Sequence, residues 1–114
     1  LVVNEIEAQD LERSIGHPLD KAGIPHVIIT RGGDGVRYVG IEGELELPAP
    51  KVNAVDTTGA GDTFLGLFLA RFSAGYALKA SLLFALVGAS IQVTRTGTAD
   101  AIPSLSEIES QLNA

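Results

Sequence analysis

Short stretches of apolar and alternating residues mark the strands that this chain is predicted to form. Nearly continuous apolar runs at residues 1–3 and 26–30 predict buried strands, and the second run is typical of a strand in a parallel sheet. Apolar and polar residues alternate at residues 36–39 and 44–47, which predicts a hairpin of two half-exposed strands. Pro48 follows directly and predicts the end of this hairpin, because proline cannot continue a ladder.

Longer segments with helical spacing predict four helices. Residues 5–15 place Ala8, Leu11 and Ile15 on one face. Residues 61–73 and 77–93 are apolar nearly all round, which predicts that other elements cover them. The last predicted helix follows Pro103 and begins with a Ser-x-x-Glu capping box, which consists of Ser104 and Glu107. Its apolar face consists of Leu105, Ile108 and Leu112. Strand, helix and strand followed by helices predict an α/β layered fold.

Composition limits the classes of function that the chain can have. The chain has 114 residues, 46% of them hydrophobic and 19% charged, which is typical of one small packed domain. Its net charge of −6 argues against nucleic acid or an anionic membrane surface as a partner. With eight Lys and Arg residues, a bound phosphate would be held largely by backbone N–H groups and a metal ion. No apolar run reaches the length of about 18 residues that a membrane span needs.

The chain contains neither Cys nor Met, and both absences affect the expectations. Without Cys there is no disulfide framework and no thiolate metal site, which is compatible with a cytoplasmic location, the one that we expect. The chain begins at Leu1, in what looks like a buried strand, so we expect it to be a piece of a longer protein.

Residues 56–62, which read Asp-Thr-Thr-Gly-Ala-Gly-Asp, carry the strongest chemical signal. They place a glycine turn directly before an apolar helix, with a carboxylate at each end of the turn, Asp56 and Asp62. Free N–H groups at a helix start attract anions, and glycine lets a phosphate come close to the main chain. A carboxylate beside such a pocket is suited to take a proton from a hydroxyl that then attacks the phosphate. The alternative is a glycine turn capped by Asp side chains, with no chemical role.

The sequence of residues 56–64 resembles the C-terminal signature of the ribokinase-like, phosphofructokinase-B-type sugar kinases. Other segments resemble that family in the same order. Residues 1–8 resemble its Asn-x-x-Glu motif, residues 30–35 its Thr-x-Gly-x-x-Gly nucleotide loop, and residues 93–98 and 102–104 its closing segment. The resemblance covers essentially the whole chain and about the last third of such an enzyme. It implies a partial domain, residues 1–114, of a three-layer α/β/α sandwich, with the N-terminal sugar-binding part and the lid absent.

The resemblance implies specific roles for the residues of the glycine turn. Asp62 would be the catalytic base that deprotonates the sugar hydroxyl for attack on the γ-phosphate of ATP. Gly59, Ala60 and Gly61, with the N–H of Asp62, would form the anion hole for the charge that builds on the transferred group. Gly61 would also contact the nucleotide.

Two further motifs would bind the nucleotide and its Mg²⁺. Asn4 would be part of the ATP site, and Glu7 would hold water molecules of the Mg²⁺ that bridges the phosphates. Read alone, Asn4 and Glu7 form a capping box at a helix start, and the two roles are compatible. Thr30, Gly32 and Gly35 would contact ATP through their backbone, at the carboxyl end of a strand, where ligands bind in α/β sheets. Read alone, this loop is an ordinary turn after a strand.

The family resemblance also implies a monovalent cation, K⁺, beside the anion hole. The matching positions are Asp56 and Thr58, together with the main-chain carbonyls of Gln92, Arg95 and Gly97. Oxygen-rich coordination of this kind suits a hard ion.

The chain departs from the ribokinase pattern at two positions near these sites. Ala101 stands where a Ser ligand of K⁺ is common, and Leu86 stands where an Asn near the adenine is common. The first departure affects the K⁺ coordination and the second affects the contact with adenine. Neither one affects Asp62.

The implied function is ATP-dependent phosphorylation of a sugar hydroxyl, with ribose as the first candidate because of residues 94–97 and their spacing to residues 102–104. The alternatives are another sugar, a nucleoside or a vitamin-like alcohol as acceptor, or a nucleotide-binding module without catalysis. The partners would be ATP and a small sugar, with no nucleic acid and no membrane, and the complete protein would be a dimer. An exposed sheet edge would favour pairing with another copy. We expect the 114 residues alone to be inactive.

Overall fold

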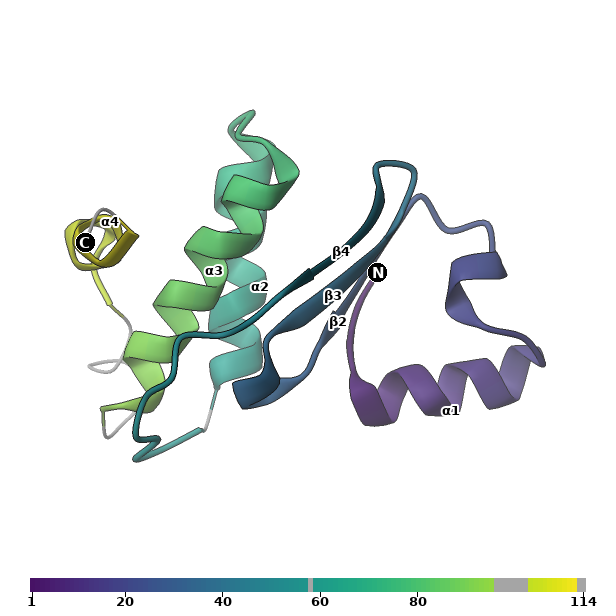
Figure 1. The fold of residues 1–114 in the computed structure, drawn as a ribbon, viewed down its shortest axis with the longest axis horizontal. Helices are drawn as coiled ribbons and strands as arrows, with labels where there is room; N and C mark the ends of the chain where they lie inside the picture. Colours follow the sequence, from purple (N-terminus) through teal and green to yellow (C-terminus); the bar gives the residue numbers. More distant parts are fainter. Residues whose placement is uncertain (58, 96–102, 113–114) are drawn as a thin grey trace. The chain divides into compact units, whose positions relative to one another are not determined.

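A computed structural model describes residues 1–57, 59–95 and 103–112. The chain divides into two compact units, residues 1–48 and residues 49–114. Figure 1 shows the ribbon of each unit, the first in purple to blue and the second in teal to yellow. Each unit has its own elements and its own packing.

The first unit is built on a four-stranded mixed sheet with the strand order β1-β2-β3-β4. β1 is parallel to β2, with Asn4 opposite Thr30, whereas β2, β3 and β4 follow one another antiparallel. The predicted parallel strand and the predicted hairpin are thus both confirmed. The elements are β1 (Val2–Asn4), α1 (Glu5–Ile15), the 3-10 turn η1 (Leu19–Lys21), β2 (His26–Thr30), the 3-10 turn η2 (Gly32–Asp34), β3 (Val36–Gly40) and β4 (Gly43–Leu47).

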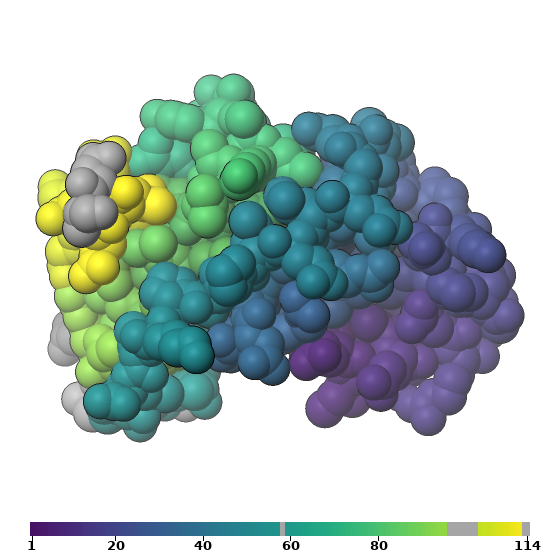
Figure 2. Space-filling view, viewed as in Figure 1, coloured from purple at the N-terminus to yellow at the C-terminus, as the bar shows by residue number. Residues whose placement is uncertain are grey.

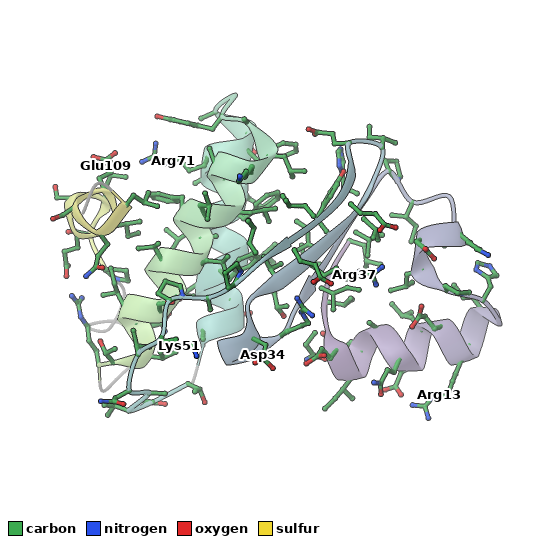
Figure 3. All side chains as sticks on the ribbon, viewed as in Figure 1. Arg13, Asp34, Arg37, Lys51, Arg71 and Glu109 are labelled. Carbon is green, nitrogen blue, oxygen red and sulfur yellow. The ribbon has the colours of Figure 1, made fainter. Side chains whose placement is uncertain are left out.

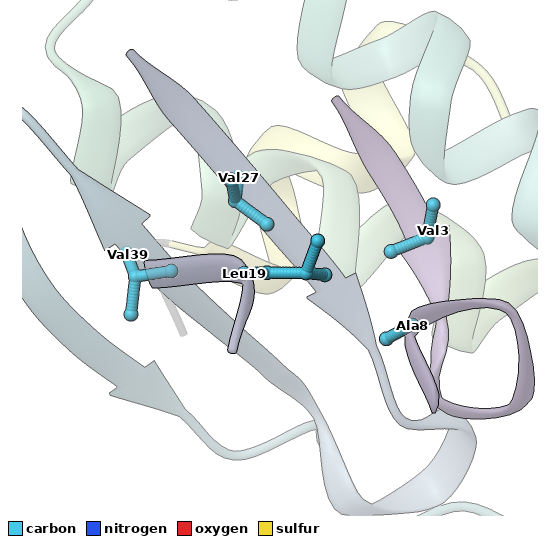
Figure 4. Packing of buried hydrophobic residues seen from close by; sticks show 5 residues of the cluster. All are labelled: Val3, Ala8, Leu19, Val27 and Val39. Atoms are coloured by element: carbon cyan, nitrogen blue, oxygen red, sulfur yellow. The ribbon is translucent and has the colours of Figure 1, made fainter. Parts of the chain in front are cut away.

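One face of this sheet packs against α1 and η1. Figure 4 shows the cluster, in which side chains from three strands, the helix and the turn meet. Its members are Val3, Ala8, Leu19, Val27 and Val39, each at most 8% exposed. Burying a side chain of the size of Val or Leu stabilises a fold by about 1.5–3 kcal/mol. This small core therefore holds α1 against the sheet and fixes the start of the helix beside the ends of β1 and β2.

The predicted apolar face of α1 is covered only near the start of the helix. Ala8 is buried, while Leu11 and Ile15 are 36% and 42% exposed. The helix nevertheless begins and ends as the sequence predicts, with Asn4 as N-cap and Gly16, at φ 80°, as C-cap. Only glycine adopts such a left-handed backbone without strain, which explains the end of the helix at this residue.

In its described residues, the second unit contains three helices, α2 (Ala60–Ser73), α3 (Leu78–Val93) and α4 (Leu105–Leu112). α3 buries nine of its residues, whereas α2 buries only Phe64 and Phe68 and leaves Leu69 48% exposed. The prediction that both apolar helices are covered is therefore confirmed for α3 and only partly so for α2. In the space-filling view of Figure 2, the yellow atoms of α4 lie on the green atoms of α3.

A glycine in α3 lets both of its neighbours approach. A Cβ added at Gly88 would lie 2.2 Å from Leu67 Cδ1 of α2 and 3.0 Å from Ile108 Cδ1 of α4. Ile108 is completely buried, and the predicted capping box before α4 is present, with Glu107 N donating to Ser104 Oγ at 3.2 Å. The described residues form a sheet and helices, so the predicted α/β class is confirmed. No helix within the described ranges is long and apolar enough to cross a membrane.

Candidate functional site

The glycine turn before α2 has the backbone geometry of an open helix start. Gly59, the N-cap, lies in the left-handed region at φ 77° and ψ 2°, which a residue with a Cβ adopts only with strain. Thr63 N donates to Gly59 O at 2.9 Å and makes the first bond of the helical ladder. Among the described residues, no side chain caps this start. The first N–H groups of α2 are therefore arranged as they are at helix starts that bind anions.

The N–H groups of this turn are not equivalent. Ala60 N donates to Thr57 O at 3.2 Å, so the predicted anion-hole residue Ala60 already has a backbone partner. Gly61 and Asp62 follow in the first turn, where the amides have no acceptor within the helix. The side of Gly61 is open, because a Cβ added there would meet no described heavy atom within 4 Å. Of the predicted amides, those of Gly61 and Asp62 are the best placed to receive an oxyanion.

The Asp62 carboxylate lies in the first turn of α2 and is exposed. A negatively charged side chain near a helix N-terminus interacts favourably with the helix dipole. Asp62 stands one residue after Gly61, so a carboxylate and amides that have no acceptor within the helix share the same helix turn. This is the arrangement that the sequence predicts for a base beside an anion hole.

The segment before the turn is tied to the end of α3. Val55 N and Asp56 N both donate to Val93 O, at 2.6 and 3.0 Å. Arg95 N donates to Gln92 O at 2.9 Å, in the turn that ends the same helix. The structure thus brings Asp56 together with the backbone around residues 92–95, where cation-binding carbonyls are predicted.

The structure describes only some of the other residues named for the cation site and the adenine contact. Thr58 and Gly97 lie outside the described residues, and so does Ala101. Leu86 is 6% exposed in the middle of α3. Arg95 has its side chain in an ion pair with Glu107 of α4, so a cation ligand from this residue would have to be its backbone carbonyl.

In the first unit, Asn4 and Glu7 form a reciprocal capping box. Glu7 N donates to Asn4 Oδ1 at 2.8 Å, and Asn4 N donates to Glu7 Oε1 at 2.9 Å. Glu7 is exposed, and its other oxygen, Oε2, makes no hydrogen bond to any described residue. A carboxylate held by one oxygen and open at the other fits an indirect contact with Mg²⁺ through water.

The predicted nucleotide loop begins at the same sheet edge. Asn4 lies opposite Thr30 in the parallel ladder, and Thr30 Oγ1 donates to Val3 O at 3.4 Å. The loop that follows is closed by Arg31 N, which donates to Gly35 O at 2.8 Å. Gly32 and Gly35 have φ values of 54° and 99°. The strand register therefore unites Asn4, Glu7 and Thr30 at the carboxyl end of the β1–β2 pair.

The site residues fall into two groups, one in each unit. Asn4, Glu7, Thr30, Gly32 and Gly35 belong to the first unit, while the turn at residues 56–62 and residues 92–95 belong to the second. Within the described parts, no three His, Asp or Glu side chains come close enough to bind a metal ion directly. The prediction for Glu7, which involves water, does not need such a cluster.

The second unit also contains a cavity that the sequence did not predict. It has a volume of about 590 Å³ and lies between the end of α3, α4 and residues 50–52. Val87, Ser90, Ile91 and Thr94 of its lining come from one side of α3 and its end. Their spacing of three and four residues was visible in the sequence, but it is shared by any buried helix face. The residues from α4 that complete the cavity could not be deduced from spacing.

Comparisons with known proteins agree with this geometry. Residues 2–105 match the pfkB family carbohydrate kinases. A ribokinase from Schizosaccharomyces pombe is 49% identical over 88 residues, which are 76% of this chain and 28% of the yeast protein. Other relatives are named deoxyribokinase and aminoimidazole riboside kinase.

Solved structures show the same fold. The crystal structure of a ribokinase from Thermotoga maritima matches with a TM-score of 0.90 and 34% identity, over 100% of this chain and 42% of that one. A putative ribokinase II from Escherichia coli, in complex with ATP and Mg²⁺, matches with a TM-score of 0.86 and 30% identity, over 98% of this chain and 38% of that one. The chain thus spans less than half the length of these relatives. On this family match and these likenesses, the chain belongs to the pfkB family of carbohydrate kinases.

Proposed function

We propose that this chain supplies the ATP site and the catalytic base of a kinase that transfers the γ-phosphate of ATP to a hydroxyl of a small sugar. The observation that carries the proposal is the first turn of α2, where the exposed Asp62 carboxylate follows a left-handed Gly59 and the open Gly61. The carboxylate accepts the proton of the attacking hydroxyl, and the hydroxyl oxygen attacks the γ-phosphorus. The bond from this phosphorus to the bridging oxygen breaks, and ADP leaves. The amides of Gly61 and Asp62 stabilise the negative charge on the transferred group.

The residues of the first unit bind the nucleotide in this proposal. The loop between Thr30 and Gly35 contacts ATP through its backbone, with Asn4 beside it on the neighbouring strand. Bound Mg²⁺ would neutralise phosphate charge, and Glu7 would hold its water molecules with the oxygen that the capping box leaves open. A solved relative in complex with ATP and Mg²⁺ supports this assignment.

A monovalent cation, K⁺, is proposed at the end of α3. Asp56, which is tied to Val93 through its backbone, would provide a charged ligand. The carbonyls of residues 92 and 95 would provide neutral ligands, together with Thr58 and Gly97. Such a cation would fix the segment that precedes the glycine turn and so orient the anion hole.

Ribose is the first candidate for the acceptor, and ribose 5-phosphate is then the product. Relatives named ribokinase support this choice, while deoxyribokinase and aminoimidazole riboside kinase among the relatives keep other sugars and nucleosides as alternatives. An ATP-consumption screen of the full-length protein against ribose, deoxyribose, fructose and adenosine would identify the acceptor. We expect the 114 residues alone not to phosphorylate a sugar, and sugar-dependent ADP formation by this chain would contradict that expectation.

The substitution Asp62→Asn in the full-length protein tests the catalytic role. Loss of a general base lowers the rate by about 10²–10⁴-fold, while Asn keeps the size of the side chain and one of its two acceptor oxygens. Asp20→Asn is the matched control, because Asp20 is also an exposed acid at the start of a helical turn. An unchanged rate in Asp62→Asn would exclude the proposed mechanism and favour a nucleotide-binding module without catalysis.

A further inference from the structure

The first unit contains a cavity of about 500 Å³ between α1 and the β3–β4 hairpin. None of the predicted nucleotide-site residues Asn4, Glu7, Thr30, Gly32 and Gly35 is part of its described lining. The polar groups that line the cavity are Glu5 and Gln9 of α1, Arg31 after β2, Arg37 of β3, and Glu44 and Glu46 of β4. Two guanidinium groups therefore border one hollow that the proposed kinase chemistry does not use.

The Arg31 side chain has a donor without an acceptor. Its Nε atom is buried and makes no hydrogen bond within the described parts of the chain. The ion pair with Glu46 spans 3.9 Å from Nη2 to Oε2, which is too long for a hydrogen bond. Buried N–H groups nearly always have a partner, so this one indicates that an acceptor belongs beside it.

Arg37 borders the same cavity, and its guanidinium also has donors without an acceptor among the described residues. It stands opposite Ile29 on one side and Glu46 on the other, and it is half-buried. Figure 3 labels this side chain on β3. Within the ranges that the structure describes, no hydrogen bond or ion pair joins its guanidinium to another residue. Each Arg has five N–H donors in a planar fork, which fits the oxygens of a phosphate group.

The carboxylates of the cavity lie where solvent weakens their effect. The three carboxylates, Glu5, Glu44 and Glu46, are all exposed. The Glu46 side chain retains 64% of its surface, whereas that of Arg31 retains 25%. Charges at an exposed rim are screened by water and salt, while the more buried guanidinium is screened less. The deeper part of the cavity therefore favours an anion in spite of the acidic rim.

We infer that Arg31 and Arg37 form a binding site for a phosphate group, either free phosphate or a small phosphomonoester. The two guanidinium groups would donate to the phosphate oxygens, and the orphan Nε of Arg31 would gain its acceptor. Gln9 and Glu5 would accept hydrogen bonds from hydroxyl groups if the phosphate is esterified to a polyol.

This site is linked to the predicted nucleotide loop through the backbone of Arg31. Arg31 N donates to Gly35 O at 2.8 Å, and Arg31 O accepts from Asp34 N at 3.0 Å. A ligand that fixes the side chain of Arg31 therefore also fixes the residue that closes the loop. Binding in the cavity would therefore stabilise the turn at residues 32–35. An effect of this binding on ATP rests on the proposed function, whereas the binding itself does not.

Titration of the 114-residue chain with inorganic phosphate, followed by ¹H–¹⁵N NMR at constant ionic strength, tests the inference. We expect saturable shifts of the Arg31 and Arg37 Nε–Hε signals and of the Gly35 amide. Arg37→Gln should weaken binding by at least about tenfold, because a hydrogen bond to a charged group is lost. The control is Arg13→Gln, which removes a charge from the exposed end of α1 outside the cavity.

Each outcome decides one part of the inference. Shifts that do not saturate, or equal weakening by Arg13→Gln and Arg37→Gln, would show general attraction of anions and overturn the site. Saturation at the two Arg signals without a shift at Gly35 would overturn the link to the loop. Glycerol 3-phosphate in a parallel titration distinguishes the sources: tighter binding than inorganic phosphate supports an esterified ligand, and weaker binding supports free phosphate. Because no turnover is measured, failure here is distinct from failure of the kinase proposal.

Discussion

Asn4 and Glu7 each bond the backbone of the other, and the Glu7 carboxylate does so with only one of its oxygens. The capping box therefore has two consequences at once. It fixes the start of α1 against the β1–β2 edge, and it holds a carboxylate with its second oxygen open to solvent. A structural role and a metal-binding role for Glu7 are thus compatible in geometry, but they can be separated by substitution.

Glu7→Gln should separate the two roles. Gln serves at this position of a capping box as well as Glu does, so the free energy of unfolding should change by less than about 1 kcal/mol, the value of the lost charge near the helix start. In the full-length kinase, the Mg²⁺ concentration for half-maximal rate should rise, because the open carboxylate oxygen is gone. Chemical denaturation and a Mg²⁺ titration of the rate measure the two effects.

Two other substitutions at the start of α1 serve as controls for Glu7. Glu5→Gln removes the same charge from the same helical turn and should leave the Mg²⁺ dependence unchanged. Asn4→Ala removes the cap and should destabilise the chain by about 0.5–2 kcal/mol. If Glu7→Gln and Glu5→Gln shift the Mg²⁺ dependence equally, Glu7 has no special role toward the metal.

Gly61→Ala should change activity without harming the fold. A Cβ at this position meets no described heavy atom within 4 Å, and alanine favours a helix over glycine by up to about 1 kcal/mol. Stability should therefore stay the same or rise. In the full-length kinase, the KM for ATP should rise or kcat should fall, because the added methyl group stands where the phosphate approaches the amide.

Gly66→Ala is the matched control for Gly61→Ala. Gly66 lies in the same helix, five residues further on, and a Cβ there also has open space. Its substitution should stabilise α2 to a similar degree and leave the rate unchanged. Equal rates for both variants would mean that no phosphate comes close to Gly61.

The turn itself depends on Gly59. At φ 77°, alanine would strain the backbone by roughly 1–2 kcal/mol, whereas Asn adopts this region more easily. Gly59→Ala should therefore lower the melting temperature more than Gly59→Asn does, and differential scanning calorimetry would show the order. The reverse order would indicate that the turn relaxes to another backbone conformation in the variants.

Much of this fold could be predicted because its signals are local. The strand at residues 26–30 and the capping boxes at Asn4 and Ser104 depend on neighbours in sequence, and they are present as predicted. What could not be predicted depends on partners far along the chain. Residues 36–39 were expected to form a half-exposed strand, and Tyr38 is in fact completely buried, with its hydroxyl 2.6 Å from His26 Nδ1. The backbone bond that joins Asp56 to Val93 has no local signal either.

The candidate site shows the same division. The glycine turn and Asp62 follow from seven consecutive residues, and the helix begins within one residue of the predicted position. The bond from Ala60 N to Thr57 O was not foreseen, because it depends on how the turn folds back rather than on which residues it contains. Likewise, Arg31 follows β2 and Arg37 lies on β3, and only the register of these two strands brings both side chains to one cavity.

Arg71 connects the three helices of the second unit, and its substitution should be destabilising. Its guanidinium lies 4.4 Å from the centre of the Tyr76 ring and 4.1 Å from that of Phe84, and Nη2 donates to Glu109 Oε1 at 2.9 Å. Figure 3 shows the labelled Arg71 and Glu109 near α4. Because the Arg71 side chain is only 15% exposed, Arg71→Ala should cost about 1–3 kcal/mol of the free energy of unfolding in urea.

Glu109→Gln distinguishes the ring contacts from the ion pair. Half of the Glu109 side chain is exposed, and ion pairs of this kind contribute under about 1 kcal/mol. The variant should therefore lose less stability than Arg71→Ala, and the loss should shrink at high salt. Equal losses in both variants would assign the main contribution to the ion pair instead of the rings.

The open edge of β1 should promote association between copies of the chain. β1 is the first strand of the described sheet, and Leu1 O accepts from Ile28 N at 2.8 Å, so Leu1 and Val3 direct their backbone groups toward β2. Val2 and Asn4 then direct theirs outward, and Glu7 already bonds the Asn4 N–H. The outward N–H of Val2 is therefore the donor that another strand can use.

Val2→Pro removes this donor and leaves the β1–β2 bonds in place, because proline is tolerated at sheet edges. Sedimentation equilibrium should show weaker self-association for this variant than for Val2→Thr, which keeps the N–H. Equal association would mean that copies do not meet through β1.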